Sequence, residues 1–188
     1  MQVLKDEIRE NIKKAAEELF YQKGFADTTT RNIADAVGIR VSNLYLYYEN
    51  KEDIFIAVIG SFCEYLNANF QRFLTTNNVD EDISDGIYRL VLDFILRDRR
   101  KFIILADKSE GTRFENAIDV VVQGLKRHIC SLLSEEIKEK ELLAYILSSN
   151  LVRGTIEIAK AYKEDDQLKE SIKYLVTYHT EGLKAIHK

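Results

Sequence analysis

The chain has 188 residues, of which 46% are hydrophobic and 31% charged, so it can bury the core of one domain or of a small head with a larger body. It contains no proline and only eight glycines, which disfavours a turn-rich β fold and favours helices throughout. The formal net charge of −4 does not by itself indicate a nucleic-acid binder. No leader pattern opens the chain and no apolar run approaches the roughly 20 residues of a membrane span, so we expect a soluble, cytoplasmic protein.

Apolar residues recur at helical spacing along nearly the whole chain, and this pattern predicts an all-α fold of about nine helices. The first helix is expected at about 5–23, followed by Gly24 in a left-handed position. The polar residues 27–30 provide N-cap chemistry for a short second helix over 30–37. Gly38 makes a turn, and a third short helix is expected from about Val41 to Tyr47.

A long fourth helix is expected over 51–74, opened by Asn50 and Asp53 as a variant of the capping box. At 1.5 Å per residue it spans roughly 36 Å, long enough to connect two bodies. The polar segment 75–82 ends it. Later helices are expected from Ile83 to about Phe94, and at about 102–108, 118–132, 139–163 and 166–187.

Two short helices joined by a glycine turn form a helix-turn-helix pattern within the first 51 residues. That stretch carries eight cations and eight anions, so any DNA-binding surface must be local, with the acids turned away. The same spacing also fits an ordinary helical corner that never contacts DNA. The residues expected to pack the two helices on each other and on the first are Ile33, Ala34, Val37, Ile39, Leu44 and Tyr48.

Four segments in this part of the chain resemble the N-terminal signature of the TetR/AcrR family of transcriptional regulators. They are AAEELFYQKGF (15–25), TTTRNIA (28–34), VGI (37–39) and LYLYYENKE (44–52). A weaker resemblance to some members covers ADKSEGTRFE (106–115). The resemblance implies a DNA-binding domain at 1–50, a ligand-binding and dimerisation domain at 51–188, and a repressor that a small molecule releases from its operator.

In that family the third helix enters the major groove, and residues around it contact bases and phosphates. The positions that correspond here are Thr29, Thr30, Arg31, Arg40, Val41, Ser42, Asn43, Tyr45, Leu46, Tyr47 and Lys51. Tyr47 and Lys51 match phosphate-contacting positions, whereas Tyr48 is expected in the core. The chain departs from the common pattern at Arg40, which cannot serve as a side-chain N-cap, so a later start capped by Ser42 is favoured. An operator sequence therefore cannot be borrowed from relatives.

The resemblance also implies a homodimer on a pseudo-palindromic double-stranded operator, formed by the last two helices. Apolar stripes there suggest an interface of Leu147, Leu151, Gly154, Ile158, Leu168, Ile172, Leu175, His179 and Leu183. The alternative is that these stripes pack within one subunit. A ligand pocket is implied among the fourth to eighth helices, and its aromatic content favours a hydrophobic or aromatic effector. Its candidates, each also explained as ordinary core, are Tyr65, Tyr88, Phe94, Phe102, His128, Asn150 and Arg153.

Other functions fit the sequence less well. A helical carboxylate–metal enzyme would need Glu-x-x-His pairs, and none of the three histidines has one, so we expect no catalytic residue, metal or cofactor. A helical small-molecule sensor or adaptor without DNA binding is the main alternative, kept open by the neutral charge balance. Cys63 and Cys130 lie in apolar helical patterns and are expected to be reduced thiols; a redox pair is the alternative.

Overall fold

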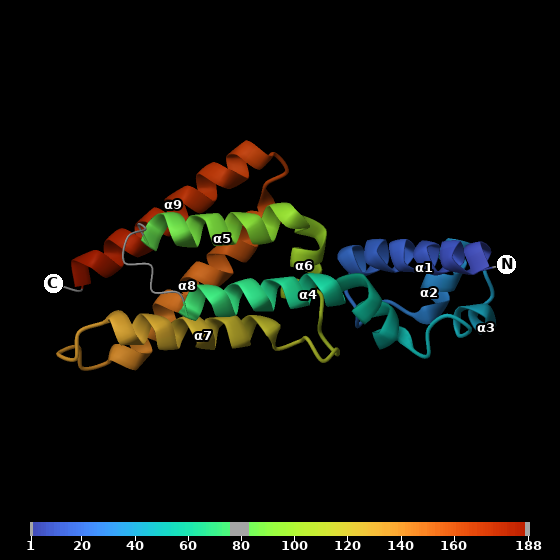
Figure 1. Cartoon of the computed structure of the whole chain (residues 1–188), viewed down its shortest axis with the longest axis horizontal. Coiled ribbons are helices and arrows are strands. Elements are labelled where there is room, and N and C mark those ends of the chain that lie inside the picture. Colours follow the sequence, from blue (N-terminus) through green and yellow to red (C-terminus); the bar gives the residue numbers. More distant parts are fainter. Residues whose placement is uncertain (1, 76–82, 187–188) are drawn as a thin grey trace. The chain divides into compact units, whose positions relative to one another are not determined.

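The structure is a computed structural model that describes residues 2–75 and 83–186. Over these ranges it contains nine α-helices and no β-strand (Figure 1), which confirms the predicted all-α fold. None of the described helices combines the length and the apolarity that crossing a bilayer requires. The helices are α1 (Gln2–Lys23), α2 (Thr30–Val37), α3 (Val41–Leu44), α4 (Lys51–Thr75), α5 (Ile83–Arg97), α6 (Arg99–Asp107), α7 (Ala117–Leu132), α8 (Lys140–Ala161) and α9 (Asp165–Ile186).

Helix boundaries agree with the predictions where the stop signals are local. The bounds of α2 are those predicted, and Gly24 and Gly38 adopt the left-handed conformation with φ of 83° and 73°. The prediction for α3 was wrong, because this helix ends at Leu44. Beyond it the backbone bonds tighten to the i to i+3 type, from Leu46 N–H to the Asn43 carbonyl (3.1 Å) and from Tyr47 N–H to the Leu44 carbonyl (3.0 Å). Most of the polar segment 75–82 lies outside the described residues.

The chain forms two compact units. The N-terminal unit comprises the residues up to Tyr65 together with Arg100–Glu115, and the second unit comprises Leu66–Arg99 and the residues from Asn116 onward. These are units of packing. The predicted functional division at residue 50 concerns activity and stays a prediction.

A cluster of phenylalanine rings forms the core of the N-terminal unit. Phe20 of α1, Phe25 of the following loop and Phe55 of α4 stack with centroid distances of 5.1–5.8 Å. Ile12, Ala16 and Phe20 recur every fourth residue and are fully buried, so one stripe of α1 faces this core.

The segment Arg100–Glu115 packs on this core although it lies far away in the sequence. Phe25 N–H donates to the Lys108 carbonyl (2.9 Å), and Arg113 N–H donates to the Glu52 carboxylate (3.1 Å). The Phe114 ring lies 6.2 Å from Phe55. Backbone bonds and ring packing thus make this segment part of the N-terminal unit.

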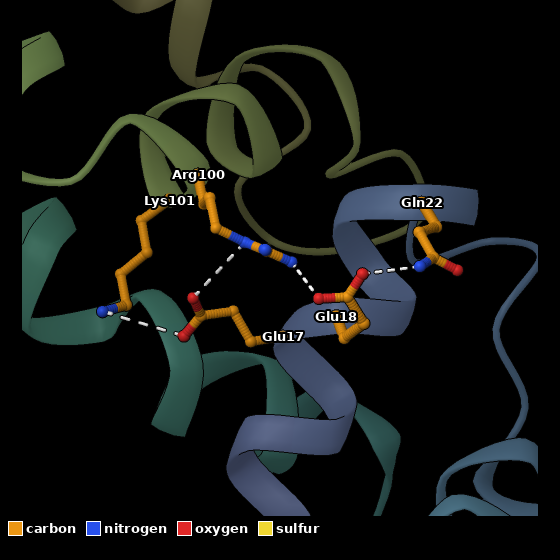
Figure 2. Close-up of polar contacts among 5 residues, drawn as sticks. All are labelled: Glu17, Glu18, Gln22, Arg100 and Lys101. Atoms are coloured by element: carbon orange, nitrogen blue, oxygen red, sulfur yellow. Dashed lines mark hydrogen bonds and ion pairs between the residues drawn. The ribbon is translucent and has the colours of Figure 1, made fainter. Parts of the chain in front are cut away.

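Charged side chains also join the start of this segment to α1 (Figure 2). The Arg100 guanidinium pairs with Glu18 and lies 3.9 Å from Glu17, whose other oxygen is 3.8 Å from the Lys101 ammonium. The hydrogen bond from Arg100, and then that from Gln22, lowers the pKa of Glu18. Because Glu18 is half-exposed, solvent screens the pair, and it orients α6 on α1 more than it stabilises the fold.

Two sets of close contacts between helices build the second unit. In the first, α9 packs against both α5 and α8, and its residues Leu168, Ile172 and Val176 are fully buried. A Cβ at Gly154 of α8 would lie 3.1 Å from Leu175. In the second, α7 packs against α8, and Gly124 of α7 permits a close approach of Phe70.

The contact at Gly124 predicts a stability difference between two glycine variants. In Gly124→Ala the new Cβ would lie 2.9 Å from a Phe70 ring carbon, so we expect a net loss of about 1–2 kcal/mol from overpacking, after a gain in helix propensity. In the control Gly86→Ala, also in a helix, nothing lies within 4 Å, so stability should stay constant or rise by up to ~1 kcal/mol. Thermal unfolding followed by circular dichroism measures both. Equal midpoints for the two variants would contradict the packing described.

Candidate nucleic-acid interface

The start of α2 is fixed by a complete capping box. Thr29 has an extended backbone, and its hydroxyl accepts from Asn32 N–H (3.1 Å) while Thr29 N–H donates to the Asn32 side-chain oxygen (3.1 Å). This confirms the predicted N-cap chemistry and places Thr30 and Arg31 in the first turn.

The turn between α2 and α3 depends on Gly38. Gly38 N–H bonds to the Ala34 and Asp35 carbonyls, and Ile39 N–H bonds to Ala34 (3.0 Å). Ile33 and Ala34 of α2 and Leu44 of α3 are fully buried, as predicted from their spacing. The small Ala34 side chain leaves room for the two helices to cross closely.

Arg40 precedes α3 with an extended backbone and makes no side-chain cap bond. The expected later start with Ser42 as cap was wrong, since the helix begins at Val41. Leu44, the last residue of this helix, is fully buried.

None of the eleven predicted DNA-contacting residues is buried in the chain. Tyr48, expected in the core, is buried, and the Arg9 guanidinium lies 5.0 Å from its ring centre. The eleven predicted DNA-contacting residues fall into two subsets by the exposure of their side chains. The exposed residues are Thr29, Arg31, Arg40, Ser42, Asn43, Tyr45 and Leu46, and the half-buried ones are Thr30, Val41, Tyr47 and Lys51.

Two residues of this surface connect its halves. The Tyr45 hydroxyl lies 3.4 Å from the Thr30 hydroxyl, so the end of the α3 turn contacts the start of α2. The Arg31 side chain is largely exposed to solvent, and its guanidinium lies 4.0 Å from the Asp35 carboxylate. From Thr29 to Lys51 there are three cations and two anions, so this stretch is slightly basic within an acidic chain.

Lys51 has a structural contact that the sequence did not indicate. Its ammonium donates to the carbonyls of Phe25 (2.6 Å) and Thr28 (2.7 Å) and lies 4.0 Å from the Phe25 ring centre. Burial lowers the pKa of this lysine. Two of its three N–H groups therefore hold the loop after α1 against the start of α4.

Comparisons with known proteins agree with this geometry. Residues 12–58 match the family model described as bacterial regulatory proteins, tetR family. The chain is 33% identical over 102 residues to the biofilm operon icaADBC negative transcriptional regulator IcaR of Staphylococcus epidermidis, a match that covers 54% of this chain and 51% of IcaR. It is 26% identical over 102 residues to the transcriptional repressor KstR2 of Mycolicibacterium smegmatis, covering 54% and 50%. These matches thus span about half the length of each relative.

The N-terminal region of this chain is thus similar to the TetR family of bacterial regulatory proteins. The fold agrees over nearly the full length with solved family structures. NalD, the secondary repressor of the MexAB-OprM multidrug efflux pump in Pseudomonas aeruginosa, superposes with a TM-score of 0.59 at 22% identity, covering 94% of this chain and 97% of NalD. A family regulator from Aquifex aeolicus gives 0.59 at 19% identity, covering 95% and 99%. At these identities the likeness concerns the fold alone.

The predicted dimer surface stays a prediction, and its residues differ in burial within the single chain. Four of the nine predicted residues, Leu151, Leu168, Ile172 and His179, are buried inside the single chain and have little surface left for a second copy. The other five are half-buried: Leu147, Gly154, Ile158, Leu175 and Leu183. Their stripes serve largely the packing of α8 on α9, which was the alternative interpretation of the pattern.

Large hydrophobic side chains are instead exposed on other sides of the same two helices. On α8 they follow the helical spacing i, i+3, i+4, and on α9 two tyrosines lie four residues apart. None of these residues was among the predicted interface residues. The exposed residues are Leu142, Tyr145, Ile146, Tyr174, Tyr178 and Ile186.

The predicted ligand-binding residues are divided between the two units. Tyr65 and Phe102 belong to the N-terminal unit, whereas the other five belong to the second unit. Asn150 and Arg153 are exposed on α8, so neither lines an enclosed pocket of a single chain. The remaining three, Tyr88, Phe94 and His128, are half-buried.

His128 and Cys63 have environments that disfavour their charged forms. The His128 ring lies 5.9 Å from Phe73, and burial lowers its pKa. Burial raises the pKa of the Cys63 thiol to about 11, which disfavours the reactive thiolate near neutral pH. Both cysteines are free and half-buried. These features favour the structural interpretation of Cys63 over a redox role.

The contrast between the two helix starts gives a testable difference in stability. Thr29→Ala removes the hydroxyl that accepts from Asn32 N–H in the capping box, and we expect it to cost about 1 kcal/mol in unfolding free energy. Ser42→Ala, also exposed and close to a helix start, should change stability by less than ~0.5 kcal/mol because Ser42 is not the cap. Urea unfolding measures both. A larger loss for Ser42→Ala would mean that α3 is capped differently from the structure.

Proposed function

We propose that this protein is a sequence-specific DNA-binding transcriptional regulator that acts as a repressor. The observation that carries the proposal is the exposure of the side chains around α3. The motif that holds them is fixed by a capping box, a left-handed glycine turn and a buried helix crossing. The family match over residues 12–58 and the repressors among the relatives support it.

In this proposal α3 and the turn after it enter the major groove of duplex DNA. Arg40 and Asn43 are suited to hydrogen-bond base edges, because guanidinium and amide groups match the guanine and adenine edges there. We assign contacts with flanking phosphates to Arg31, Tyr47 and Lys51. We also propose that the protein is cytoplasmic, because its partner is nucleic acid. We propose that it binds without catalysis, as a family of regulators does.

The proposed assembly is a homodimer, because two symmetric half-sites compensate for the few contacts of one short helix. We place its interface on the exposed side chains of α8 and α9, from Leu142 to Ile146 and at Tyr174 and Tyr178, instead of the buried stripes. Clustered exposed apolar groups on a soluble chain are typical of such contacts.

We further propose that a small effector, hydrophobic or aromatic in character, binds the second unit and weakens DNA binding. The chain passes between the units at three points, after Tyr65, Arg99 and Glu115. A change in the second unit can thus act on α4 and on both ends of the segment Arg100–Glu115. Effector and operator then oppose each other by linkage. Effector-saturated protein with undiminished operator affinity would contradict this step.

DNA binding is tested on duplexes that carry the intergenic region next to the gene. We expect affinity that falls steeply with salt, since each phosphate neutralised adds about 0.9 to the slope of log K against log salt. Arg31→Ala and Tyr45→Ala should each weaken specific binding at least about tenfold. Arg127→Ala, an exposed arginine of α7, is the matched control and should have no effect. Weak, sequence-independent binding that is unaffected by these variants would favour an adaptor without DNA recognition.

The dimer surface is tested by light scattering after size exclusion. The double variant Ile146→Asp/Tyr178→Asp places charges on two exposed apolar positions, so the fold should survive while the dimer dissociates to monomers. Val120→Asp on α7, at a position that is also exposed, should remain dimeric. A wild-type monomer, or a double variant that remains dimeric, would remove this surface from the proposal.

A further inference from the structure

Leu46 is the most exposed large hydrophobic side chain in the described part of the chain. It is 79% exposed, more than Tyr178 at 73%, and it lies in the turn that follows α3. Its exposed neighbours are the polar Ser42 and Asn43 and the aromatic Tyr45, so Leu46 is the one exposed aliphatic side chain of this turn. Isolated apolar residues are common on protein surfaces, but this one lies in the motif proposed to contact base edges.

The position of Leu46 is set by the backbone and by its neighbours. Its N–H donates to the Asn43 carbonyl (3.1 Å), which makes Leu46 and Asn43 neighbours three residues apart on one side of a helical turn. Leu44 and Tyr48 are buried on the inward side. Since the inward residues are fixed by packing, Leu46 is left exposed on the outer side of this turn, as is Asn43.

The groove chemistry of DNA limits what such a side chain can contact favourably. The major-groove edges of the base pairs present hydrogen-bonding groups, with one apolar exception, the 5-methyl group of thymine. The minor groove presents no methyl group, and a phosphate gives no favourable partner for leucine. Burial against a methyl group also removes the apolar surface of Leu46 from water.

We propose that Leu46 packs against the 5-methyl group of a thymine in the major groove and so makes a T·A pair a determinant of operator specificity in each half-site. This inference rests on the proposed DNA-binding function and names the base chemistry that it recognises. The neighbouring Asn43 amide is in position to hydrogen-bond the edge of the same or an adjacent pair.

The experiment starts with selection of duplex DNA from a random pool by the wild-type protein. Each thymine of the selected half-site is then replaced in turn by deoxyuridine, which removes only the methyl group and keeps the hydrogen-bonding edge. At one position we expect affinity to fall about fourfold per half-site, and roughly fifteenfold when both half-sites are changed.

Variants of the protein connect that loss to Leu46. Leu46→Ala should bind the thymine operator about as weakly as wild type binds the uridine operator, and should no longer distinguish the two. Leu46→Met keeps a flexible apolar side chain and should keep most of the discrimination. Val120→Ala, an exposed apolar position on α7, is the control and should behave as wild type. Because Leu46 is largely exposed, circular dichroism should show all four proteins equally folded.

Each outcome of this experiment decides a different question. Selection of a defined sequence without thymine in its half-site overturns the inference while the proposed function stands. Equal sensitivity to deoxyuridine in wild type and Leu46→Ala also overturns it, because another residue then contacts the methyl group. Failure to select any sequence overturns the proposed function, and the inference with it.

Discussion

The close packing of α2 against α3 is the constraint on which the candidate interface depends. A helix of four residues cannot persist alone in water, because the cost of nucleating a helix exceeds what so few hydrogen bonds return. It persists here because Leu44 is fully buried against α2 and because Gly38 turns the chain with a left-handed φ of 73°. The same burial determines which side chains are left outside. The orientation of Asn43, Tyr45 and Leu46 is therefore a consequence of packing on the opposite side.

A second consequence follows from the way the N-terminal unit is assembled. It is discontinuous in sequence, since Arg100–Glu115 completes a unit otherwise made of the first 65 residues. Its attachment includes a backbone bond to Phe25, a ring contact between Phe55 and Phe114, and ion pairs from Arg100 and Lys101 to α1. The ion pairs also neutralise two carboxylates of α1. Because the first 51 residues carry equal numbers of cations and anions, this neutralisation favours a locally basic surface around α2 and α3.

The parts of this fold that were predictable are those that depend on a few adjacent residues. The threonine cap at 29 and the glycines at 24 and 38 act over one helical turn, and periodicity reveals which residues of α1 face a core. The end of α3 was not predictable, because helical spacing continues through Tyr48 while the hydrogen bonds change to the tighter type. The role of Lys51 as a donor to two loop carbonyls was hidden for a related reason: its partners lie 23 and 26 residues away.

Periodicity alone does not show which partner an apolar stripe of α8 or α9 faces. A stripe that faces another helix of the same chain and a stripe that faces a second copy have the same composition and spacing, and only exposure separates them. Leu168 and Ile172 have no exposed surface, whereas Tyr174 and Tyr178 on the same helix are largely exposed. Exposure in turn separates two kinds of partner. Several exposed apolar groups on adjacent helices suit a protein surface, which is itself extensive and apolar at its centre. A single exposed aliphatic side chain beside hydrogen-bonding groups suits a surface that offers one methyl group among hydrogen-bonding atoms, as the major-groove edge of a thymine does.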